Sequence, residues 1–202
     1  MVDTLLVPAR SEFILGGQRS GKSRRAELLA RCWLQSAPEH RAVMIATAQP
    51  WDDEMRQRIE RHQLDRALRV PGMSTVEEPL ALAEKIRAHS RADTLVVVDC
   101  LTLWLTNCLM PVELEIPPIY ESNQPPGPAS RAQAAMLLEA IEAAPGPVVL
   151  VGNEIGLGVI PMGAEVRAFV DALGRLNQEV AAVCQRVTLM AAGLPLTLKA
   201  PA

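Results

Sequence analysis

Apolar residues along the chain gather in short, nearly continuous runs that alternate with segments of helical periodicity. The strand-like runs are Glu12–Leu15, Ala42–Ala46, Thr94–Cys100, Pro147–Val151 and Val187–Met190. Because these runs lack the alternation of a strand with one solvated face, they predict strands buried on both faces. A parallel sheet with helices on each side buries its strands in this way.

Helical periodicity marks the segments between the runs. Apolar residues recur at helical spacing in Arg24–Gln35 and Pro79–His89, whereas Asp52–Leu68 is strongly charged and has Asp52 as its N-cap. The segment Leu101–Met110 is apolar nearly all round, so it must be buried in the core or against another subunit. Strands separated by helices predict a doubly wound α/β fold, with a mostly parallel sheet and helices on both faces.

One domain accounts for residues 1–202. A chain of 202 residues with 49% hydrophobic content can build one full core. Residues 111–128 are rich in proline and predict a surface loop of this domain, because the α/β rhythm resumes after them. Residues 1–11 form an N-terminal extension before the first strand.

Charge and composition argue against several classes of partner. The net charge is −3 and aromatic residues make up 3% of the chain, so neither a basic surface nor a stacking platform favours nucleic acid. No segment approaches the roughly 20 apolar residues needed to cross a bilayer. The four cysteines lack metal-ligand spacing and are interpreted as buried free thiols. We therefore expect a soluble cytoplasmic protein with neither a nucleic-acid nor a membrane partner.

The first strand runs directly into a phosphate-binding motif. The pattern G-x-x-x-x-G-K-[ST] is met by Gly16, Gly17, Gln18, Arg19, Ser20, Gly21, Lys22 and Ser23. A strand precedes the motif and a helix follows it, as a P-loop requires. The backbone N–H groups and the helix N-terminus are expected to bind the phosphates of a nucleoside triphosphate. Lys22 would reach the β- and γ-phosphates, and the Ser23 hydroxyl would ligate Mg²⁺.

Other polar candidates follow neighbouring strands. Asp99 ends the run Leu95–Val98 and fits the second carboxylate of a magnesium shell. Asn153 and Glu154 follow another strand, at the edge where open α/β sheets bind ligands. A solvated loop pair is an equally good interpretation of Asn153 and Glu154.

A phosphate cradle does not name a reaction, because kinases, hydrolases, nucleotidyltransferases and nucleotide-gated switches all use one. No guanine-reading N-K-x-D pattern is present, so the preferred base does not follow from spacing.

Several further stretches resemble one family from Glu12 to Lys199. They are GGQRSGKSRRAE (16–27), IATAQPWDDEMRQRIERH (45–62), VDCLTLWLTN (98–107), GNEIGLGVIP (152–161) and GRLNQ (174–178). Together they resemble the bifunctional adenosylcobinamide kinase / adenosylcobinamide-phosphate guanylyltransferases of cobalamin biosynthesis. The long D-D-E-M-x-x-R-I-x-x-H and N-E-I-G-L-G patterns are far more specific than the P-loop.

The resemblance implies a two-step transferase with a RecA-like P-loop fold and a homotrimeric assembly. Such an enzyme phosphorylates adenosylcobinamide with ATP or GTP. It then transfers GMP from GTP to the adenosylcobinamide phosphate, through a covalent GMP–histidine intermediate. The products are adenosylcobinamide-GDP and pyrophosphate.

The resemblance also implies site residues. The nucleophile matches His62, and Lys22 belongs to the catalytic group. Nucleotide contacts carry over to residues 16–23 and to Ala46, Thr47, Ala48, Gln63, Leu64, Asp65, Arg66, Glu77 and Asp99, with Mg²⁺ at Ser23 and Asp99. This chain departs from the family in several ways, the first of which is its longer N-terminal lead. Met73 stands where the family commonly has tryptophan, and the spacing from His62 to Glu77 is a few residues longer.

The residues themselves leave two interpretations of His62. Met55, Ile59 and His62 share one face at helical spacing, so the histidine could simply end an apolar seam. Guanylyl transfer by double displacement instead needs a nucleophile, and a neutral imidazole can attack near pH 7. His40 and His89 are the next candidates.

Two other functions remain open at this point. A P-loop small-molecule kinase without nucleotidyl transfer would use Lys22, Ser23 and Asp99 but leave His62 idle. A non-catalytic nucleotide switch would turn over little substrate. Retention of label from α-labelled GTP on the denatured protein separates the guanylyltransferase from both.

Overall fold

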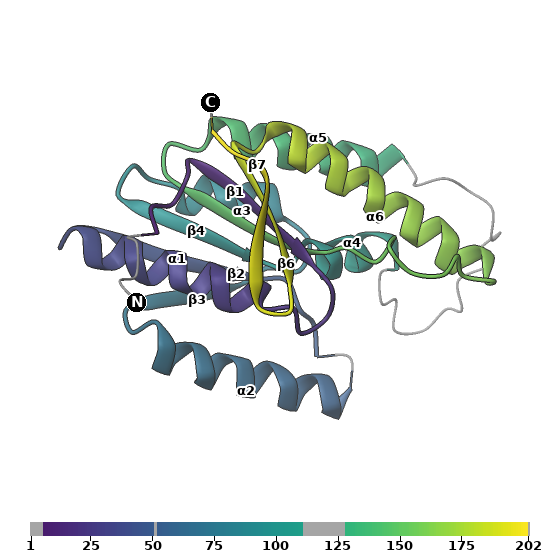
Figure 1. The fold of residues 1–202 in the computed structure, drawn as a ribbon, viewed down its shortest axis with the longest axis horizontal. Coiled ribbons are helices and arrows are strands. Elements are labelled where there is room, and N and C mark those ends of the chain that lie inside the picture. Colours follow the sequence, from purple (N-terminus) through teal and green to yellow (C-terminus); the bar gives the residue numbers. More distant parts are fainter. Residues whose placement is uncertain (1–5, 51, 111–127, 202) are drawn as a thin grey trace.

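A computed structural model describes residues 6–50, 52–110 and 128–201 and places them in three layers, with a sheet between helices (Figure 1). The strands are β1 Ser11–Gly16, β2 Arg41–Ala46, β3 Met73–Glu77, β4 Thr94–Asp99, β5 Val148–Asn153, β6 Arg186–Ala191 and β7 Leu194–Lys199. Their order across the sheet is β3-β2-β4-β5-β1-β6-β7. All neighbours pair in parallel except β6 and β7, which form an antiparallel hairpin. The predicted mostly parallel α/β sheet is confirmed.

The five predicted strands are present, and β3 and β7 are additional edge strands. The interior strand β4 is buried over Thr94–Val98, as its continuous apolar run predicts. In contrast, β3 has only half-buried and exposed residues, and β7 is exposed throughout. An edge strand needs no continuous apolar run, because one side of it has no neighbouring strand.

Six helices occupy the described residues. They are α1 Lys22–Ser36, α2 Asp53–Arg69, α3 Leu82–His89, α4 Leu101–Leu109, α5 Pro128–Ala143 and α6 Ala164–Val183. Helix α2 begins as predicted, because the Asp52 carboxylate accepts a hydrogen bond of 2.7 Å from the Met55 N–H. Helices α5 and α6 were not predicted as separate elements. None of the helices in the described ranges combines the length and hydropathy needed to cross a membrane.

Several predicted boundaries are wrong by one to three residues. Ser11, expected in the N-terminal extension, is the first residue of β1, because it pairs with Val148 of β5. The helix expected from Pro79 starts at Leu82, because the Glu78 carboxylate accepts hydrogen bonds from the N–H groups of Leu80 and Ala81 and holds them in a turn. The proline-rich loop was expected to end at Pro128, but Pro128 is the first residue of α5. Proline is tolerated there because the first residues of a helix need no N–H hydrogen bond within the helix. Residues 111–127 lie outside the described ranges.

The sheet separates two hydrophobic cores. One face packs against α3, α4, α5 and α6, and the other packs against α1. Within the first core, three apolar residues of α4 are buried: Leu101, Trp104 and Leu105. The apolar helix predicted over Leu101–Met110 is therefore buried within this chain, so its apolar character gives no support for a second subunit.

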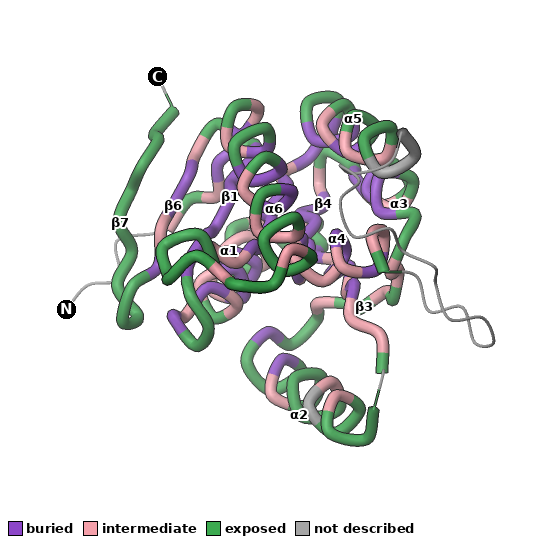
Figure 2. Tube along the Cα trace, turned by 90° about the vertical axis from the view of Figure 1, so that its right-hand side faces the viewer, coloured by how far each residue is buried: buried purple, intermediate pink, exposed green. Residues whose placement is uncertain are grey.

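Helix α2 stands beside β3 rather than over the sheet, and most of its residues are exposed (Figure 2). The described part of the N-terminal extension, in contrast, lies against the body. The Arg10 guanidinium donates to the carbonyl oxygens of Glu142 (2.8 Å) and Ala144 (3.5 Å), at the C-terminal end of α5.

The cysteine interpretation is half right. All four thiols are free, but only Cys100 and Cys184 are buried, while Cys32 and Cys108 are half-buried. Burial raises the pKa of the Cys184 thiol to about 12 and that of Cys108 to about 11.

Candidate functional site

The P-loop forms the turn from β1 into α1, and its shape depends on glycine. Gly16 has a φ of 154° and Gly21 a φ of 100°, conformations that other residues rarely adopt. A Cβ atom on Gly16 would lie 2.5 Å from the carbonyl oxygen of Met190 in β6. On the other side of the loop, the N–H of Gly193 donates to the carbonyl oxygen of Ser20 over 3.0 Å. The β6–β7 hairpin therefore contacts the P-loop at both ends, through Met190 near Gly16 and through Gly193 at Ser20.

The loop offers several donors for an anion. Gly17, Gln18 and Arg19 are exposed at its rim, and the Ser20 hydroxyl is buried without a partner. Helix α1 starts at Lys22 after a glycine N-cap, which has no side chain to occupy the first N–H groups. Such an array of unpaired donors at a helix N-terminus fits phosphate oxygens.

Lys22 closes the loop. Its side chain is buried, and its Nζ donates to the carbonyl oxygen of Gly17 over 2.6 Å. Burial lowers the pKa of the Lys22 ammonium from its ordinary value, and the nearby Cys100 and Asp99 oppose this shift. A phosphate in the loop would supply the negative charge that this buried cation lacks.

The structure brings together the two predicted magnesium residues. Ser23 Oγ lies 3.5 Å from Asp99 Oδ1, across the carboxyl ends of β1 and β4. A hydroxyl beside one carboxylate fits Mg²⁺, which takes its remaining ligands from phosphates and water. No cluster of three or more acidic, histidine or cysteine side chains suited to a metal occurs in the described ranges.

Thr47 holds the end of β4 in place. Its hydroxyl donates to the Cys100 carbonyl over 2.8 Å and accepts from the Cys100 N–H over 2.9 Å. Asn107 of α4 then donates to the Thr47 carbonyl over 2.8 Å. The Thr47 hydroxyl is thus committed to the backbone that carries Asp99. Its neighbours Ala46 and Ala48, at the end of β2, are half-buried.

The C-terminal half of α2 is tied to β3. Gln63 Nε2 donates to Glu77 Oε1 over 3.2 Å, which joins two of the predicted nucleotide contacts. Arg66 is buried and donates to the Thr75 hydroxyl over 3.2 Å, while its Nε is buried without a partner. This group lies at the edge of the sheet, beside β2.

The remaining predicted contacts of α2 have different surroundings. Leu64 is 69% exposed, and Asp65 forms an ion pair of 3.1 Å with Arg69. Arg69 also pairs over 2.9 Å with Glu27 of α1. The Arg69–Glu27 pair fastens α2 to α1 and joins a half-exposed guanidinium to a buried carboxylate, at 47% and 6% exposure.

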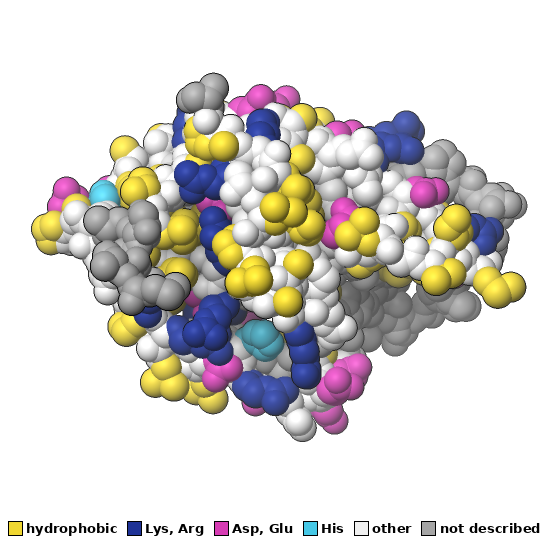
Figure 3. Space-filling view, viewed as in Figure 1, with side chains coloured by type: hydrophobic (Ala, Val, Ile, Leu, Met, Phe, Trp, Pro, Cys, Tyr) yellow, Lys and Arg dark blue, Asp and Glu magenta, His cyan; other side chains and the backbone are white. Residues whose placement is uncertain are grey.

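His62 is exposed on α2, although Met55 and Ile59 on the same face are half-buried. The histidine therefore does not pack as the end of an apolar seam. Figure 3 shows a histidine side chain on the surface over α2, among Lys and Arg side chains. His40, in contrast, stacks on Trp33 with ring centroids 3.7 Å apart and has a structural role.

Asn153 is the last residue of β5 rather than a loop residue, Glu154 follows it, and both are half-buried. The Glu154 N–H donates to the carbonyl oxygen of Gly16 over 3.1 Å, which joins the end of β5 to the P-loop. The buried Asn177 of α6 donates to the Asn153 carbonyl over 3.1 Å. Sequence spacing did not single out Asn177, because its partner lies 24 residues away on another element.

The sequence interpretation also missed a buried acid under the P-loop. Glu12 is fully buried in β1 and pairs with Arg25 of α1 (3.0 Å) and Arg186 of β6 (3.1 Å). The Thr188 hydroxyl donates to the same carboxylate over 2.9 Å. The sequence did not indicate this network, because Arg25 and Arg186 lie far from Glu12 along the chain.

Comparison with known proteins gives consistent matches along the chain. Residues 12–198 match the model of a family described as cobinamide kinase / cobinamide phosphate guanyltransferase. The "Bifunctional adenosylcobalamin biosynthesis protein CobP" of Pseudomonas aeruginosa is 46% identical over 192 residues, which cover 93% of this chain and 96% of that protein. The Escherichia coli protein of the same description, CobU, is 36% identical over 186 residues, covering 92% of this chain and 98% of that protein.

A solved structure supports the fold alone. The flagellar accessory protein FlaH from Methanocaldococcus jannaschii superposes with a TM-score of 0.51 at 12% sequence identity. The match covers 96% of this chain and 80% of that chain.

Proposed function

The chain belongs to the cobinamide kinase / cobinamide phosphate guanyltransferase family, and from that premise we propose that it performs two successive transfers on adenosylcobinamide. ATP or GTP phosphorylates the aminopropanol hydroxyl, and GMP from GTP is then joined to that phosphate. The relatives' names, which call them bifunctional, support two activities in one chain. The observation that carries the proposal is the P-loop, with Lys22 inside it and Ser23 beside Asp99.

The kinase step uses the P-loop. The substrate hydroxyl oxygen attacks the γ-phosphorus, the bond from that phosphorus to the β–γ bridging oxygen breaks, and the hydroxyl proton leaves to solvent. Lys22 and the N–H groups at the start of α1 stabilise the charge on the phosphates. Mg²⁺ held by Ser23 and Asp99 would neutralise the phosphate charge further.

The guanylyl step uses His62. A neutral imidazole nitrogen attacks the α-phosphorus of GTP, and pyrophosphate leaves. An oxygen of adenosylcobinamide phosphate then attacks the same phosphorus, and the P–N bond breaks to release adenosylcobinamide-GDP. Of the three histidines, His62 is the one that is exposed, which supports its assignment as the nucleophile.

Labelling with α-labelled GTP tests the covalent step. Wild-type protein should retain an acid-labile, base-stable label after denaturation, as a phosphoramidate does. His62→Ala should retain none and should still phosphorylate adenosylcobinamide from ATP. The matched control His40→Ala should label like wild type. Label on the His62→Ala protein would move the nucleophile to another residue.

The alternatives make different predictions in the same assay. A small-molecule kinase would phosphorylate adenosylcobinamide without retaining label, and a nucleotide switch would do neither. Retained label on His62 would exclude both.

The assembly we propose is a homotrimer. The exposed apolar residues Leu194, Leu196 and Leu198 of β7 offer a surface on which subunits could associate. A stable monomer in sedimentation at micromolar concentration would overturn this assembly.

A further inference from the structure

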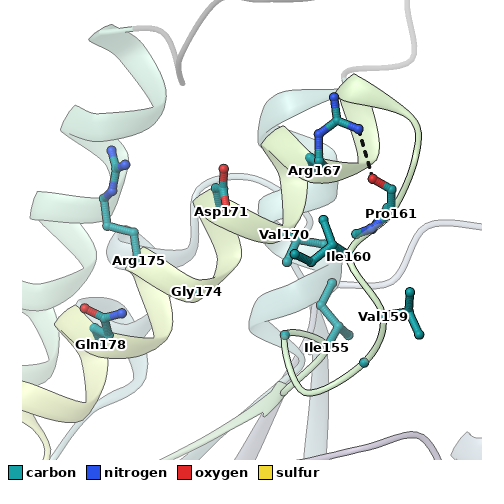
Figure 4. A pocket seen from close by; sticks show the side chains of 12 residues that line it. Ile155, Val159, Ile160, Pro161, Arg167, Val170, Asp171, Gly174, Arg175 and Gln178 are labelled. Carbon is teal, nitrogen blue, oxygen red and sulfur yellow. Dashed lines mark hydrogen bonds between the residues drawn. The ribbon is translucent and has the colours of Figure 1, made fainter.

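We propose that the cleft between residues 154–163 and α6 holds the corrin ring of the substrate, an inference that rests on the proposed function. The cleft has a volume of about 580 Å³ and lies between the loop that follows β5 and the middle of α6, from Arg167 to Gln178 (Figure 4). The nucleotide residues described above do not line it. Two stretches of the family resemblance, 152–161 and 174–178, meet there.

The two walls of the cleft have opposite chemistry. The loop contributes Ile155 and Ile160, which are 41% and 78% exposed, whereas the Val159 side chain points away from α6 (Figure 4). Helix α6 contributes Asp171 and Arg175, four residues apart on one face, with other polar residues on the same side. A corrin ring matches both walls, because it is a broad apolar macrocycle bordered by amide side chains that need donors as well as acceptors.

The cleft begins where the phosphate site ends. Glu154, the first residue of the loop, donates its N–H to Gly16 of the P-loop over 3.1 Å. Asn177 of α6 binds the carbonyl of Asn153 over 3.1 Å. A corrin ring in the cleft would therefore lie beside the phosphates, at the carboxyl edge of the sheet where open α/β folds bind ligands.

The loop that forms the apolar wall is fastened to the helix. Arg167, in the first turn of α6, donates to the carbonyl oxygen of Pro161 over 2.9 Å (Figure 4). This contact joins the far end of the loop to the helix, so the wall is held at both ends. Its exposed apolar side chains stay on the surface unless a ligand covers them.

Gly174 keeps the floor of the cleft open. It lies in the middle of α6, and a Cβ atom there would meet nothing within 4 Å. Glycine is a poorer helix former than alanine, so α6 would be more stable with alanine at this position. The fold does not require a glycine at this position, but a bulky ligand does.

Direct binding of cobinamide, measured by equilibrium dialysis, tests the proposal. Gly174→Leu should raise the Kd for cobinamide by about tenfold or more, with a smaller rise for Gly174→Ala. Both variants should keep or gain thermal stability, bind GTP normally and label His62 from GTP alone. The control Ala182→Leu adds the same side chain at an exposed position of α6 outside the cleft and should bind like wild type.

The outcomes separate this inference from the proposed function. Unchanged cobinamide binding by Gly174→Leu overturns the cleft and leaves the transfers intact. If the same variant instead alters sedimentation, the cleft is a contact between copies of the chain. Wild-type protein that binds cobinamide through this cleft without phosphorylating it overturns the proposed function alone. Wild-type protein that does not bind cobinamide overturns both.

Discussion

The P-loop and helix α2 carry the two halves of the proposed chemistry, and the chain holds them in different ways. The P-loop lies between buried strands, with Lys22 8% exposed and the fully buried Glu12 beneath it. Helix α2 leaves His62 exposed and is fastened by separate polar pairs, Arg69 with the buried Glu27 and the buried Arg66 with Thr75. The phosphate site is therefore embedded in the sheet, whereas α2 is held through side-chain pairs of its C-terminal half. Kinase activity should depend on the buried network, and guanylyl transfer should depend on the contacts of α2.

The largest effect should follow from removing the charge inside the P-loop. Lys22→Ala should lower kcat/KM for phosphorylation of adenosylcobinamide by about 10²–10³-fold, because phosphate-clamp groups supply a few kcal/mol of transition-state stabilisation. Steady-state kinetics would measure this. The control is Lys85→Ala, a partly exposed lysine with a weak ion pair of 3.9 Å to Glu78. A folded Lys22→Ala enzyme with normal turnover would contradict the P-loop assignment.

The next effect tests the buried half of the comparison. Glu12→Ala should lower the free energy of unfolding by about 3 kcal/mol, because it leaves the Arg25 and Arg186 guanidinium groups, 11% and 23% exposed, without their fully buried carboxylate partner. Urea denaturation would measure the change, with Glu39→Ala as an exposed acidic control. If Glu12→Ala does not fold, Glu12→Gln keeps the shape and should still be less stable than wild type. Wild-type stability in both variants would show that the network does not hold the P-loop.

A smaller effect should separate α2 from the P-loop. Arg66→Ala should slow GMP labelling of His62 by about tenfold, as loss of one charged hydrogen-bond donor implies. ATP-dependent phosphorylation should stay within about twofold of wild type. Arg56→Ala removes an exposed arginine of the same helix and serves as the control. Equal losses in both reactions would mean that the two regions act as one site.

The ion pair that fastens α2 to α1 should matter less for stability than the Glu12 network. Arg69→Ala should lower the free energy of unfolding by about 1–2 kcal/mol, because the Arg69 side chain is 47% exposed, whereas its partner Glu27 is 6% exposed and loses its cation. Thermal denaturation would show it. A loss as large as that of Glu12→Ala would remove the distinction between the two regions.

The smallest effect is a proton taken up when nucleotide binds at alkaline pH. Burial lowers the pKa of Lys22 in the free protein, so part of its charge is lost at a lower pH than for an ordinary lysine. A bound triphosphate favours the ammonium and raises that pKa again, so binding takes up protons and affinity falls as pH rises. Calorimetry in buffers of different ionisation enthalpy would detect the uptake, and Lys22→Ala should abolish it.

The sequence predicts what is local and continuous. The runs that became β4 and β5 are buried on both faces, and the P-loop is eight consecutive residues with a fixed spacing. In these cases the residues adjacent in sequence determine the local structure, so the sequence pattern is enough to predict it. The strand β7 went unpredicted because its six residues are all exposed, so its position depends on pairing with β6 rather than on burial.

Contacts between distant residues set the rest of the site. Thr47 and Cys100 lie 53 residues apart, and Glu12 and Arg186 lie 174 apart. No spacing rule joins such pairs, since the fold alone brings them together. Gln63 and Glu77 entered through the family resemblance, and the structure places them in contact. The cleft beside α6 had no single motif, because its two walls come from separate stretches of the chain.

The support that the β6–β7 hairpin gives to the P-loop has a consequence for biosynthesis. Chains begin to fold during synthesis, at about 5–20 residues per second, with earlier segments folding first. Here Gly16 pairs with Met190, and the Ser20 carbonyl accepts a hydrogen bond from Gly193. The P-loop therefore cannot make these contacts until residues 190–193 have been synthesised, many seconds after the loop itself. We expect a nascent chain, or a product truncated before β6, to have the P-loop sequence without the contacts that hold its backbone shape. Nucleotide binding should therefore report that the ribosome has finished this domain, and incomplete chains should compete poorly for cellular GTP.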